Sequence, residues 1–277
     1  MKKIIINLAF ILFILIGVSV LLYPIISDYF NSISQSRAVA QYFDDVTDMD
    51  DSKKQEFLDA AREYNKRLLS RPDRFHFSEA DYEEYNRQLD TGNSTIGVLT
   101  IEKIDVNLPI YLGTNEGVLQ VGVGHMEGTS LPVGGIGTHA FLTGHRGLPS
   151  STLLSDLDQM AIDDTFMVYV MGEILTYQVD DITTVLPEEV QSVALDPDKD
   201  QCTLLTCTPY GVNTHRLLVR GQRIETPTDA DWGIGDAKRL NKILVVLLFV
   251  VPVVIPALII YAIVQSRKIR KRGKLNQ

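Results

Sequence analysis

The chain has 277 residues, of which 45% are hydrophobic and 22% are charged, a composition that excludes a disordered chain. The formal net charge of −9 argues against a nucleic-acid-binding protein, and the length allows one or two domains. Two cysteines are too few to hold a small secreted module together by disulfides.

The charges are segregated along the chain. Asp28 is the first acidic residue and Asp236 the last, so the two ends hold only basic charges. Between these residues there are 35 acidic side chains and 15 basic ones. A single soluble domain rarely sorts its charges in this way, whereas a membrane protein does.

Two long apolar runs flank the acidic segment. Residues 4–26 contain no formal charge over 23 positions, and residues 243–264 contain none over 22. About 20 apolar residues of helix span a bilayer, and membrane helices tolerate prolines such as Pro252 and Pro256. We therefore expect an N-terminal membrane anchor over residues 1–27 and a C-terminal transmembrane helix over residues 243–264.

Basic residues border both runs on their outer sides. Lys2 and Lys3 precede the first run, and a basic tail at residues 265–277 follows the second. Because positive flanks remain in the cytoplasm, both termini are expected there. The acidic segment then lies outside the cell membrane, and membrane lipid is an expected partner. Nucleic-acid binding by the tail is the less favoured interpretation.

A cleaved signal peptide is the alternative to an N-terminal anchor. Residues 38–40 read Ala-Val-Ala, which has the A-x-A form of a cleavage site. However, the apolar run is longer than the roughly 7–15 residues usual in a signal peptide, and eleven residues separate its end from Ala38. The sequence favours an uncleaved anchor.

Residues 28–91, the first part of the outer segment, are predicted to form a helical extension. Apolar residues recur at helical spacing through residues 52–69, and Ser78 with Asp81 forms a capping box before a second helix. A breaker segment lies between the two. A helical hairpin or a helical cover over residues 44–90 is therefore expected.

Residues 92–226 change to short alternating or apolar runs, which are typical of β-strands separated by turns. Many short strands favour a mainly β domain, either a closed barrel or a sandwich. Residues 227–242 form the linker back to the membrane. Strands are expected at residues 104–110, 138–143, 165–170, 174–179, 203–207 and 216–224, with a hairpin turn at 171–173 and a short helix at 156–161.

Cys207 is the first candidate for chemistry. It ends an apolar strand and precedes a turn, so its thiol is expected at a barrel rim, where catalytic groups tend to lie. Cys202 is five residues earlier, faces the other way and is about 17 Å distant, which is beyond disulfide reach. We expect Cys202 to be a small buried hydrophobe, which is also the plain interpretation of Cys207 taken alone.

Histidines supply possible partners for the thiol. His145 follows a predicted strand and stands between two glycines, which allow a substrate backbone to approach closely. His125 and His139 are expected to be hydrogen-bonded structural residues. A zinc site made of His139, His145 and Cys207 matches no standard ligand spacing and is disfavoured.

His145, Cys207 and Arg216 together supply the parts of an acyl-transfer site. A thiol nucleophile must become a thiolate, which a neighbouring imidazolium favours, and the imidazolium can also protonate a leaving amine. A fixed guanidinium can hold the carbonyl or the oxyanion. Arg216 begins the strand that follows Cys207, so the two are expected to face each other across a hairpin-like connection.

These three residues resemble those of the sortase family. Residues 203–207, Thr-Leu-Leu-Thr-Cys, are similar to the family's TLxTC signature. Arg216 lies where the family's essential arginine follows, and Thr143-Gly144-His145 matches the segment that carries its catalytic histidine.

Longer blocks resemble class C, the pilus-assembling sortases. They lie at residues 124–132, 143–149 and 207–220, in the order that the class has. The resemblance extends over residues 50–226, and the two apolar runs with their basic flanks also fit the class.

The resemblance implies a sortase-type eight-stranded β-barrel with an N-terminal helical extension and two flanking transmembrane helices. It implies a cysteine transpeptidase on the outer face of a Gram-positive membrane, without a cofactor or a metal. The enzyme would cleave LPxTG-like sorting signals of pilin subunits between Thr and Gly and pass the thioester on Cys207 to a pilin lysine. His145 would be the general acid and base, Arg216 would position substrate and oxyanion, and Thr206 and Thr143 would contact the substrate.

One departure from class C concerns the lid, in which an Asp-Pro-aromatic motif plugs the active site. That order is absent here, but residues 72–75 read Pro-Asp-Arg-Phe in about the same place. Asp73 and Phe75 are the candidate lid residues, because this loop could reach Cys207 or Arg216. The alternative is a loop that only joins two helices packed on the barrel.

Three other functions remain open. A housekeeping sortase would attach surface proteins to a peptidoglycan amine. A membrane-anchored adhesin or scaffold would leave the three residues unused, and a cysteine protease would resolve the acyl-enzyme with water. The acceptor amine distinguishes the first from pilus assembly, and the rate of mild thiol alkylation at Cys207 tests the second.

Overall fold

The computed structural model describes residues 2–71, 73–192, 195–227 and Tyr261. The C-terminal helix predicted at residues 243–264, the basic tail and most of the predicted linker lie outside this part of the chain. The helices are α1 (Lys2–Asp48), α2 (Asp51–Leu69), α3 (Glu79–Asn86) and α4 (Glu116–Val121). The strands are β1 (Thr95–Ile101), β2 (Val106–Leu112), β3 (Val123–His125), β4 (Thr138–Thr143), β5 (Thr165–Val170), β6 (Glu173–Val185), β7 (Asp200–Thr208) and β8 (His215–Ile224).

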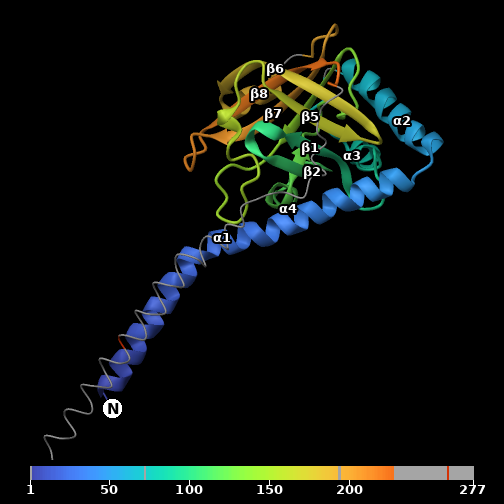
Figure 1. Cartoon of the computed structure of the whole chain (residues 1–277). Helices are drawn as coiled ribbons and strands as arrows, with labels where there is room; N and C mark the ends of the chain where they lie inside the picture. The colour runs from blue at the N-terminus through green and yellow to red at the C-terminus, as the bar shows by residue number, and fades with distance from the viewer. Residues whose placement is uncertain (1, 72, 193–194, 228–260, 262–277) are drawn as a thin grey trace, which may run out of the picture. The chain divides into compact units, whose positions relative to one another are not determined.

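The eight strands of the described chain close into a barrel in the order β1-β2-β3-β4-β7-β8-β6-β5, with β5 pairing back to β1 (Figure 1). The predicted mainly β barrel is therefore confirmed. The pairs β2–β3 and β4–β7 are parallel, and the other six pairs are antiparallel. Parallel pairing brings the ends of β4 and β7 to the same rim of the barrel.

Several predicted strands match the structure closely, and others differ. The expected bounds of β4 and β5 are those observed, and the predicted hairpin turn has positive φ angles at Met171 and Gly172. β6 continues to Val185, six residues beyond its predicted end. The predicted helix at residues 156–161 is a 3₁₀ turn, Leu157–Gln159. β1, β3 and α4 were not predicted, because β1 is buried at nearly every position and β3 is three residues long.

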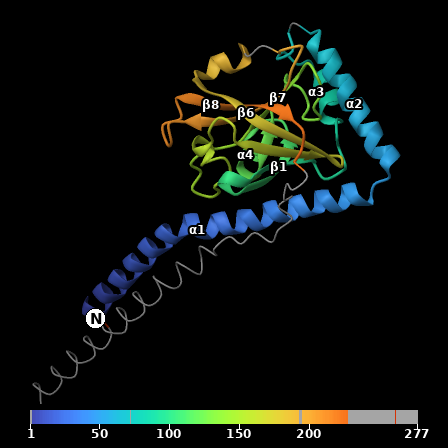
Figure 2. The ribbon, with the colours of Figure 1, turned by 45° about the horizontal axis from the view of Figure 1, so that its top comes forward.

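α1 is a single helix from Lys2 to Asp48, so the predicted boundary between the anchor and the helical extension lies inside it. Its C-terminal half runs along the barrel beside β1, β2 and α4 (Figure 2). There Tyr42 is fully buried, donates its hydroxyl to the Ile96 carbonyl at 2.9 Å and accepts the Met171 amide at 3.1 Å. This half of the helix therefore shares the barrel's hydrophobic core.

The N-terminal half of α1 has the opposite character. The helix is long and apolar enough to cross a membrane, and none of its apolar window is buried in the protein. Among the described residues it is the one such helix. The structure thus describes one of the two predicted membrane segments, and its exposed apolar surface is what a bilayer would cover.

α2 and α3 pack on the barrel through buried polar groups as well as apolar ones. The Asn65 amide of α2 donates to the Leu131 carbonyl at 3.0 Å and accepts the Leu131 amide at 2.8 Å. The predicted capping box of α3 is confirmed, with Asp81 N donating to Ser78 Oγ and Ser78 N donating to the Asp81 carboxylate. These bonds fix the helical extension against the rim loops.

Tyr85 of α3 makes the deepest of these contacts. Its hydroxyl lies 2.8 Å from His125 Nδ1 and 3.0 Å from the His125 carbonyl, and it accepts the Gly113 amide at 3.0 Å. His125 Nε2 lies 2.8 Å from the Ser130 carbonyl, which requires a donor at that nitrogen. His125 is fully buried, and this burial lowers its pKa to about 4. The imidazole is therefore neutral in the folded protein.

We predict that His125 makes the fold sensitive to acid. In the unfolded chain His125 binds a proton below about pH 6.5, whereas in the folded chain it does so only near pH 4. Its contribution is fully present above pH 6.5 and is lost as the pH falls toward 4, by roughly 3 kcal/mol in total. Denaturant unfolding between pH 7.5 and 4.5 should show this loss in the wild type and in His76→Gln, which changes an exposed histidine. A His125→Gln variant should give a flatter curve, and an equally steep one would contradict the assignment.

Candidate active site

The parallel pairing of β4 and β7 aligns the two sequence motifs that contain His145 and Cys207. In the register of this pair Thr143 lies opposite Leu205, and the Gly144 amide continues it by donating to the Leu205 carbonyl at 3.0 Å. His145 follows the end of β4 by two residues, and Cys207 lies near the end of β7. The histidine and the cysteine, 62 residues apart in sequence, are therefore placed at the same rim of the barrel.

Cys207 and Arg216 are brought together by the β7–β8 hairpin. They are direct cross-strand partners in its antiparallel register. Directly opposed residues project their side chains from the same face of a sheet, with Cβ atoms about 5 Å apart. Cys207 is a free cysteine and is partly exposed. The expected juxtaposition of Cys207 and Arg216 is thus what the strand register produces.

The Arg216 guanidinium is held by its own hairpin. Its Nη1 donates to the carbonyls of Asn213 and His215, each at 3.1 Å. Within the described part of the chain no carboxylate pairs with it. A guanidinium has five N–H donors in a rigid fork, so its remaining donors are available to a carbonyl or oxyanion beside Cys207.

His145 is partly exposed, with 24% of its side chain accessible. Its Nε2 lies 3.5 Å from a carboxylate oxygen of Glu116, the first residue of α4, and makes no hydrogen bond among the described residues. The Gln120 amide donates to the other Glu116 oxygen at 3.0 Å, and this bond together with the His145 charge lowers the pKa of Glu116. A carboxylate therefore faces the imidazole Nε2 across 3.5 Å. Glu116 was not identified from the sequence, because no motif joins it to His145.

Arg146 connects the two motif loops and was also missed. Its Nη1 donates to Thr208 Oγ1 at 3.2 Å, and its Nε donates to the Ser155 carbonyl at 3.1 Å. It also pairs with Asp158, and only 8% of its side chain is exposed. Arg146, the residue after His145, is thus hydrogen-bonded to Thr208, the residue after Cys207. Its position beside His145 in a Gly-His-Arg-Gly run was the signal that could have identified it.

Thr206 makes a third connection between the motifs. It is fully buried, and its hydroxyl donates to the Gly144 carbonyl at 2.8 Å. This bond joins β7 to the turn just before His145. Thr143 is the last residue of β4 and is partly exposed. Substrate contact by Thr206 and Thr143 stays a prediction.

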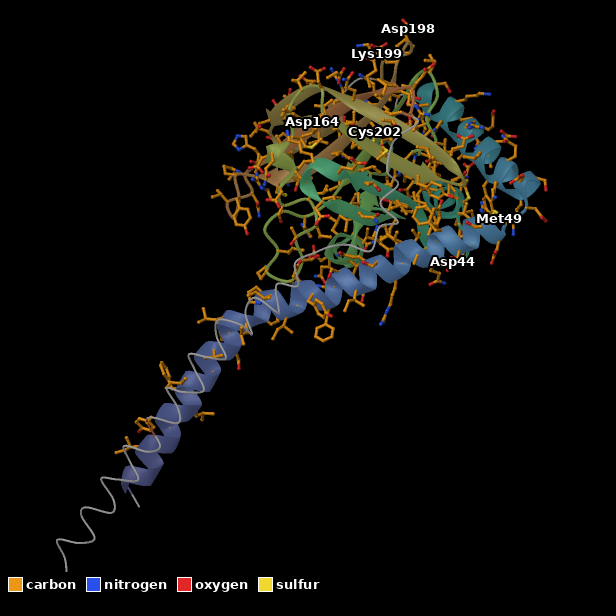
Figure 3. All side chains as sticks on the ribbon, viewed as in Figure 1. Asp44, Met49, Asp164, Asp198, Lys199 and Cys202 are labelled. Atoms are coloured by element: carbon orange, nitrogen blue, oxygen red, sulfur yellow. The ribbon has the colours of Figure 1, made fainter. Side chains whose placement is uncertain are left out.

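Cys202, His125 and His139 have the structural roles expected of them. Cys202 is fully buried inside the barrel (Figure 3), forms no disulfide, and burial raises the pKa of its thiol. His139 Nε2 lies 2.7 Å from Thr203 Oγ1, and His125 bonds Tyr85 as described above. These residues stabilise the barrel and leave Cys207 as the cysteine of the described chain whose thiol is partly exposed.

Comparison with known proteins identifies the fold. A sortase-domain family model matches residues 99–224. Sortase C1 from Streptococcus agalactiae is 47% identical in a match that covers 69% of this chain and all of that one, with a TM-score of 0.66. The chain belongs to the sortase family. Sortase C from Streptococcus pneumoniae, whose structure addresses catalysis and pilin substrate specificity, is 41% identical over 69% of this chain and 97% of that one, with a TM-score of 0.63.

These neighbours confirm the resemblance to class C sortases. A curated sortase A from Streptococcus agalactiae serotype III is 31% identical over 155 residues, which is 53% of this chain and 62% of that protein. The sortase described here therefore spans less than two thirds of the length of that relative. The helical extension lies outside the match to the family model.

The candidate lid of this sortase is held to α3 and to the β3–β4 loop. Arg71 bonds the Asp81 carboxylate with both terminal nitrogens, at 2.6 and 2.9 Å, and its Nε donates to Asp73 at 3.2 Å. The Phe75 ring packs against Gly128, where an added Cβ would lie 2.5 Å from the ring. Among the described residues no hydrogen bond or ion pair joins Asp73 to Cys207 or Arg216, so a plug made by Asp73 and Phe75 stays a prediction.

We predict that the Thr206 hydroxyl stabilises this rim. Thr206→Val keeps the shape of the side chain but leaves the buried Gly144 carbonyl without its donor, which should cost about 1–2 kcal/mol. Denaturant unfolding of Thr206→Val should show this loss, and Thr206→Ser, which keeps the hydroxyl, should be closer to the wild type. Equal stabilities of the two variants would show that the hydrogen bond contributes nothing.

Proposed function

We propose that this sortase is a membrane-anchored cysteine transpeptidase that cleaves LPxTG-like sorting signals between Thr and Gly and joins pilin subunits through a lysine isopeptide bond. The observation that carries the proposal is the cross-strand pairing of Cys207 with Arg216 at the rim where His145 also lies. A nucleophile, an acid–base group and a cation with free donors form an acyl-transfer site. The pilin substrate is proposed from the likeness to sortase C of Streptococcus pneumoniae.

In the first half-reaction the Cys207 thiolate attacks the Thr carbonyl carbon of the signal. The carbonyl oxygen becomes an oxyanion, which the unpaired donors of Arg216 stabilise. The His145 imidazolium donates its proton to the Gly nitrogen as the C–N bond breaks. The Gly-containing fragment leaves as a neutral amine, and the acyl group remains on Cys207 as a thioester.

In the second half-reaction a neutral lysine amine attacks the thioester carbonyl. His145, now neutral, accepts a proton from the attacking nitrogen. The C–S bond breaks, an isopeptide bond forms, and the thiolate and imidazolium are restored. The Glu116 carboxylate lies 3.5 Å from His145 Nε2 and is near enough to orient the imidazole during both half-reactions.

Anchoring by α1 is supported by its continuity. The A-x-A sequence at residues 38–40 lies inside the helix, and Val39 in its middle is buried in the shared core. Cleavage there would remove the helical turns that precede Tyr42 on the barrel. The packing therefore supports an uncleaved N-terminal anchor.

A regulatory lid is proposed for the loop of Asp73 and Phe75. Its support is the sequence resemblance together with the clamping of the loop by Arg71 and the packing of Phe75 on Gly128. Phe75→Ala removes that packing while leaving the Arg71–Asp81 pair intact. The variant should expose the site if the loop covers it.

Attachment of surface proteins to peptidoglycan is the second candidate function. The observation in its favour is the 31% identity to a curated sortase A. The two functions share the acyl-enzyme and differ only in the amine that resolves it. The acceptor amine therefore decides between them.

The proposed function predicts a covalent intermediate. Full-length protein in phospholipid nanodiscs, incubated with an LPxTG peptide, should show by mass spectrometry an adduct on Cys207 that ends at the Thr residue. Addition of a pilin lysine peptide should transfer the acyl group to the lysine amine, and a peptidoglycan-type amine should do so poorly. The full chain is needed because α1 packs into the barrel core.

The variants define how the outcomes are interpreted. Cys207→Ala should form no adduct and keep the wild-type unfolding midpoint, because a rim thiol contributes little packing. An adduct seen only with Phe75→Ala would indicate the same enzyme closed by its lid. The absence of any adduct in both the wild type and Phe75→Ala would contradict the transpeptidase proposal, and preferred transfer to the peptidoglycan-type amine would support the second function.

We predict that Arg216→Lys fails as an enzyme although it keeps the positive charge. An ammonium lacks the planar fork that bonds two hairpin carbonyls and an oxyanion together. Loss of one oxyanion donor lowers turnover by about 100-fold or more, so single-turnover acylation should slow by at least that factor. Near-normal acylation would remove Arg216 from the mechanism, and Arg223→Lys on the same strand serves as the matched control.

A further inference from the structure

The part of α1 just beyond the apolar run contacts the loop that follows His145. Asp28 accepts hydrogen bonds from Thr152, at 2.8 Å from its amide and 3.0 Å from its hydroxyl. Further along the helix, Asn31 donates to the Ser150 carbonyl at 2.8 Å, and Gln35 donates to the Ser151 hydroxyl at 3.0 Å.

The three helix residues lie on one face of α1. Their spacing, three and then four positions, is the repeat that aligns side chains along a helix. Gln35 and its partner Ser151 are only 6% and 2% exposed, so this hydrogen bond is shielded from water. Buried amide and hydroxyl groups must be paired to avoid a desolvation penalty. The helix therefore specifies the position of residues 150–152.

The contacted loop folds back onto His145. The Leu154 amide donates to the His145 carbonyl at 3.2 Å, and the Leu154 side chain occupies the space beside Gly144, where an added Cβ would lie 2.7 Å from Leu154 Cγ. Leu154 is two residues from Thr152, which is about 7 Å of extended chain. The contact with Asp28 is thus transmitted to His145 through a short, packed segment.

We propose that Asp28, Asn31 and Gln35 are positioning residues, so that the membrane-proximal part of the anchor helix is a structural component of the active site. They hold the loop of residues 148–154, and through Leu154 they hold His145 at the rim that contains Cys207. The expected effect on turnover rests on the proposed transpeptidase function. The expected effect on the loop rests only on the contacts that α1 makes with it. The residues lie outside the match to the family model.

The test uses the full-length protein in phospholipid nanodiscs and two independent measurements. The first is amide hydrogen exchange of the segment covering residues 146–156, which includes the Thr152 amide bonded by Asp28. The second is steady-state transfer of a soluble LPxTG peptide to a lysine peptide. The test variant is Asp28→Ala combined with Gln35→Ala, and the matched control is Ser36→Ala, an exposed neighbour whose hydroxyl bonds only the helix's own Ser32 carbonyl.

In the double variant we expect exchange of the loop about tenfold faster and kcat about tenfold lower, with KM changed by less than twofold. The single variant Asp28→Asn retains an oxygen that accepts from Thr152. It should therefore match the wild type in both loop exchange and kcat. Ser36→Ala should match the wild type in both measurements. A change in KM alone would indicate a role in substrate binding and overturn the positioning role.

Unchanged loop exchange or unchanged kcat in the double variant would also overturn the inference. So would an equal loss in Ser36→Ala, which would indicate a general effect on the helix. If neither the wild type nor Phe75→Ala transfers peptide, the proposed function fails, but hydrogen exchange still tests the contact between α1 and the loop. Faster exchange in the double variant supports the role of Asp28, Asn31 and Gln35, and equal exchange refutes it.

Discussion

The parallel pairing of β4 with β7 is the constraint on which the active site depends. Parallel strands end at the same rim, and the strands that separate these two in sequence, β5 and β6, lie on the far side of β8 in the barrel. A slip of one residue in a strand register would turn every side chain to the opposite face. The hydrogen bond of Thr206 to Gly144 and the bridge of Arg146 to Thr208 both cross this pair, and both fix its register next to the reacting groups.

The helical extension and the barrel form one packed unit. Tyr42, Asn65 and Tyr85 each come from a different helix, and each bonds backbone groups of the barrel or its loops at a buried position. Buried hydrogen bonds of this kind contribute modestly when made and cost more when one partner is removed. The polar contacts therefore fix the orientation of the three helices, while the shared apolar core supplies most of the stability.

The sequence predicted the residues at the barrel rim better than the side chains that contact and support them. Cys207 and Arg216 are nine residues apart on one hairpin, so their meeting is a local property that strand patterns reveal. His145 could be assigned only through its motif. The barrel topology, and not nearness in sequence, brings it to the rim that contains Cys207. Glu116 was missed because no motif or spacing joins it to His145, and Arg146 was missed because its adjacency to His145 does not reveal its bond to Thr208.

The helix α1 is a second case in which sequence patterns gave an incomplete prediction. The apolar run was assigned to an anchor at residues 1–27 and the following residues to a helical extension, with the boundary where the first charge, Asp28, appears. A helix does not end at a charge, and neither a helix-stopping glycine nor a proline occurs between Asp28 and Asp48. The absence of stop signals predicts one continuous helix. The change in hydropathy at Asp28 suggested a boundary that lies inside this helix.

Continuity of the helix has a mechanical consequence for an anchored enzyme. A flexible linker would let the barrel occupy a wide range of heights and orientations above the bilayer. Here Asp28 lies two residues beyond the apolar run, about 3 Å along the helix axis, and its side chain bonds the loop that follows His145. If α1 spans the membrane as proposed, the rim with Cys207 is held near the bilayer surface by a continuous helix. The anchor then sets where the acyl transfer takes place, because the helix that fixes the enzyme to the membrane also contacts its active-site loop.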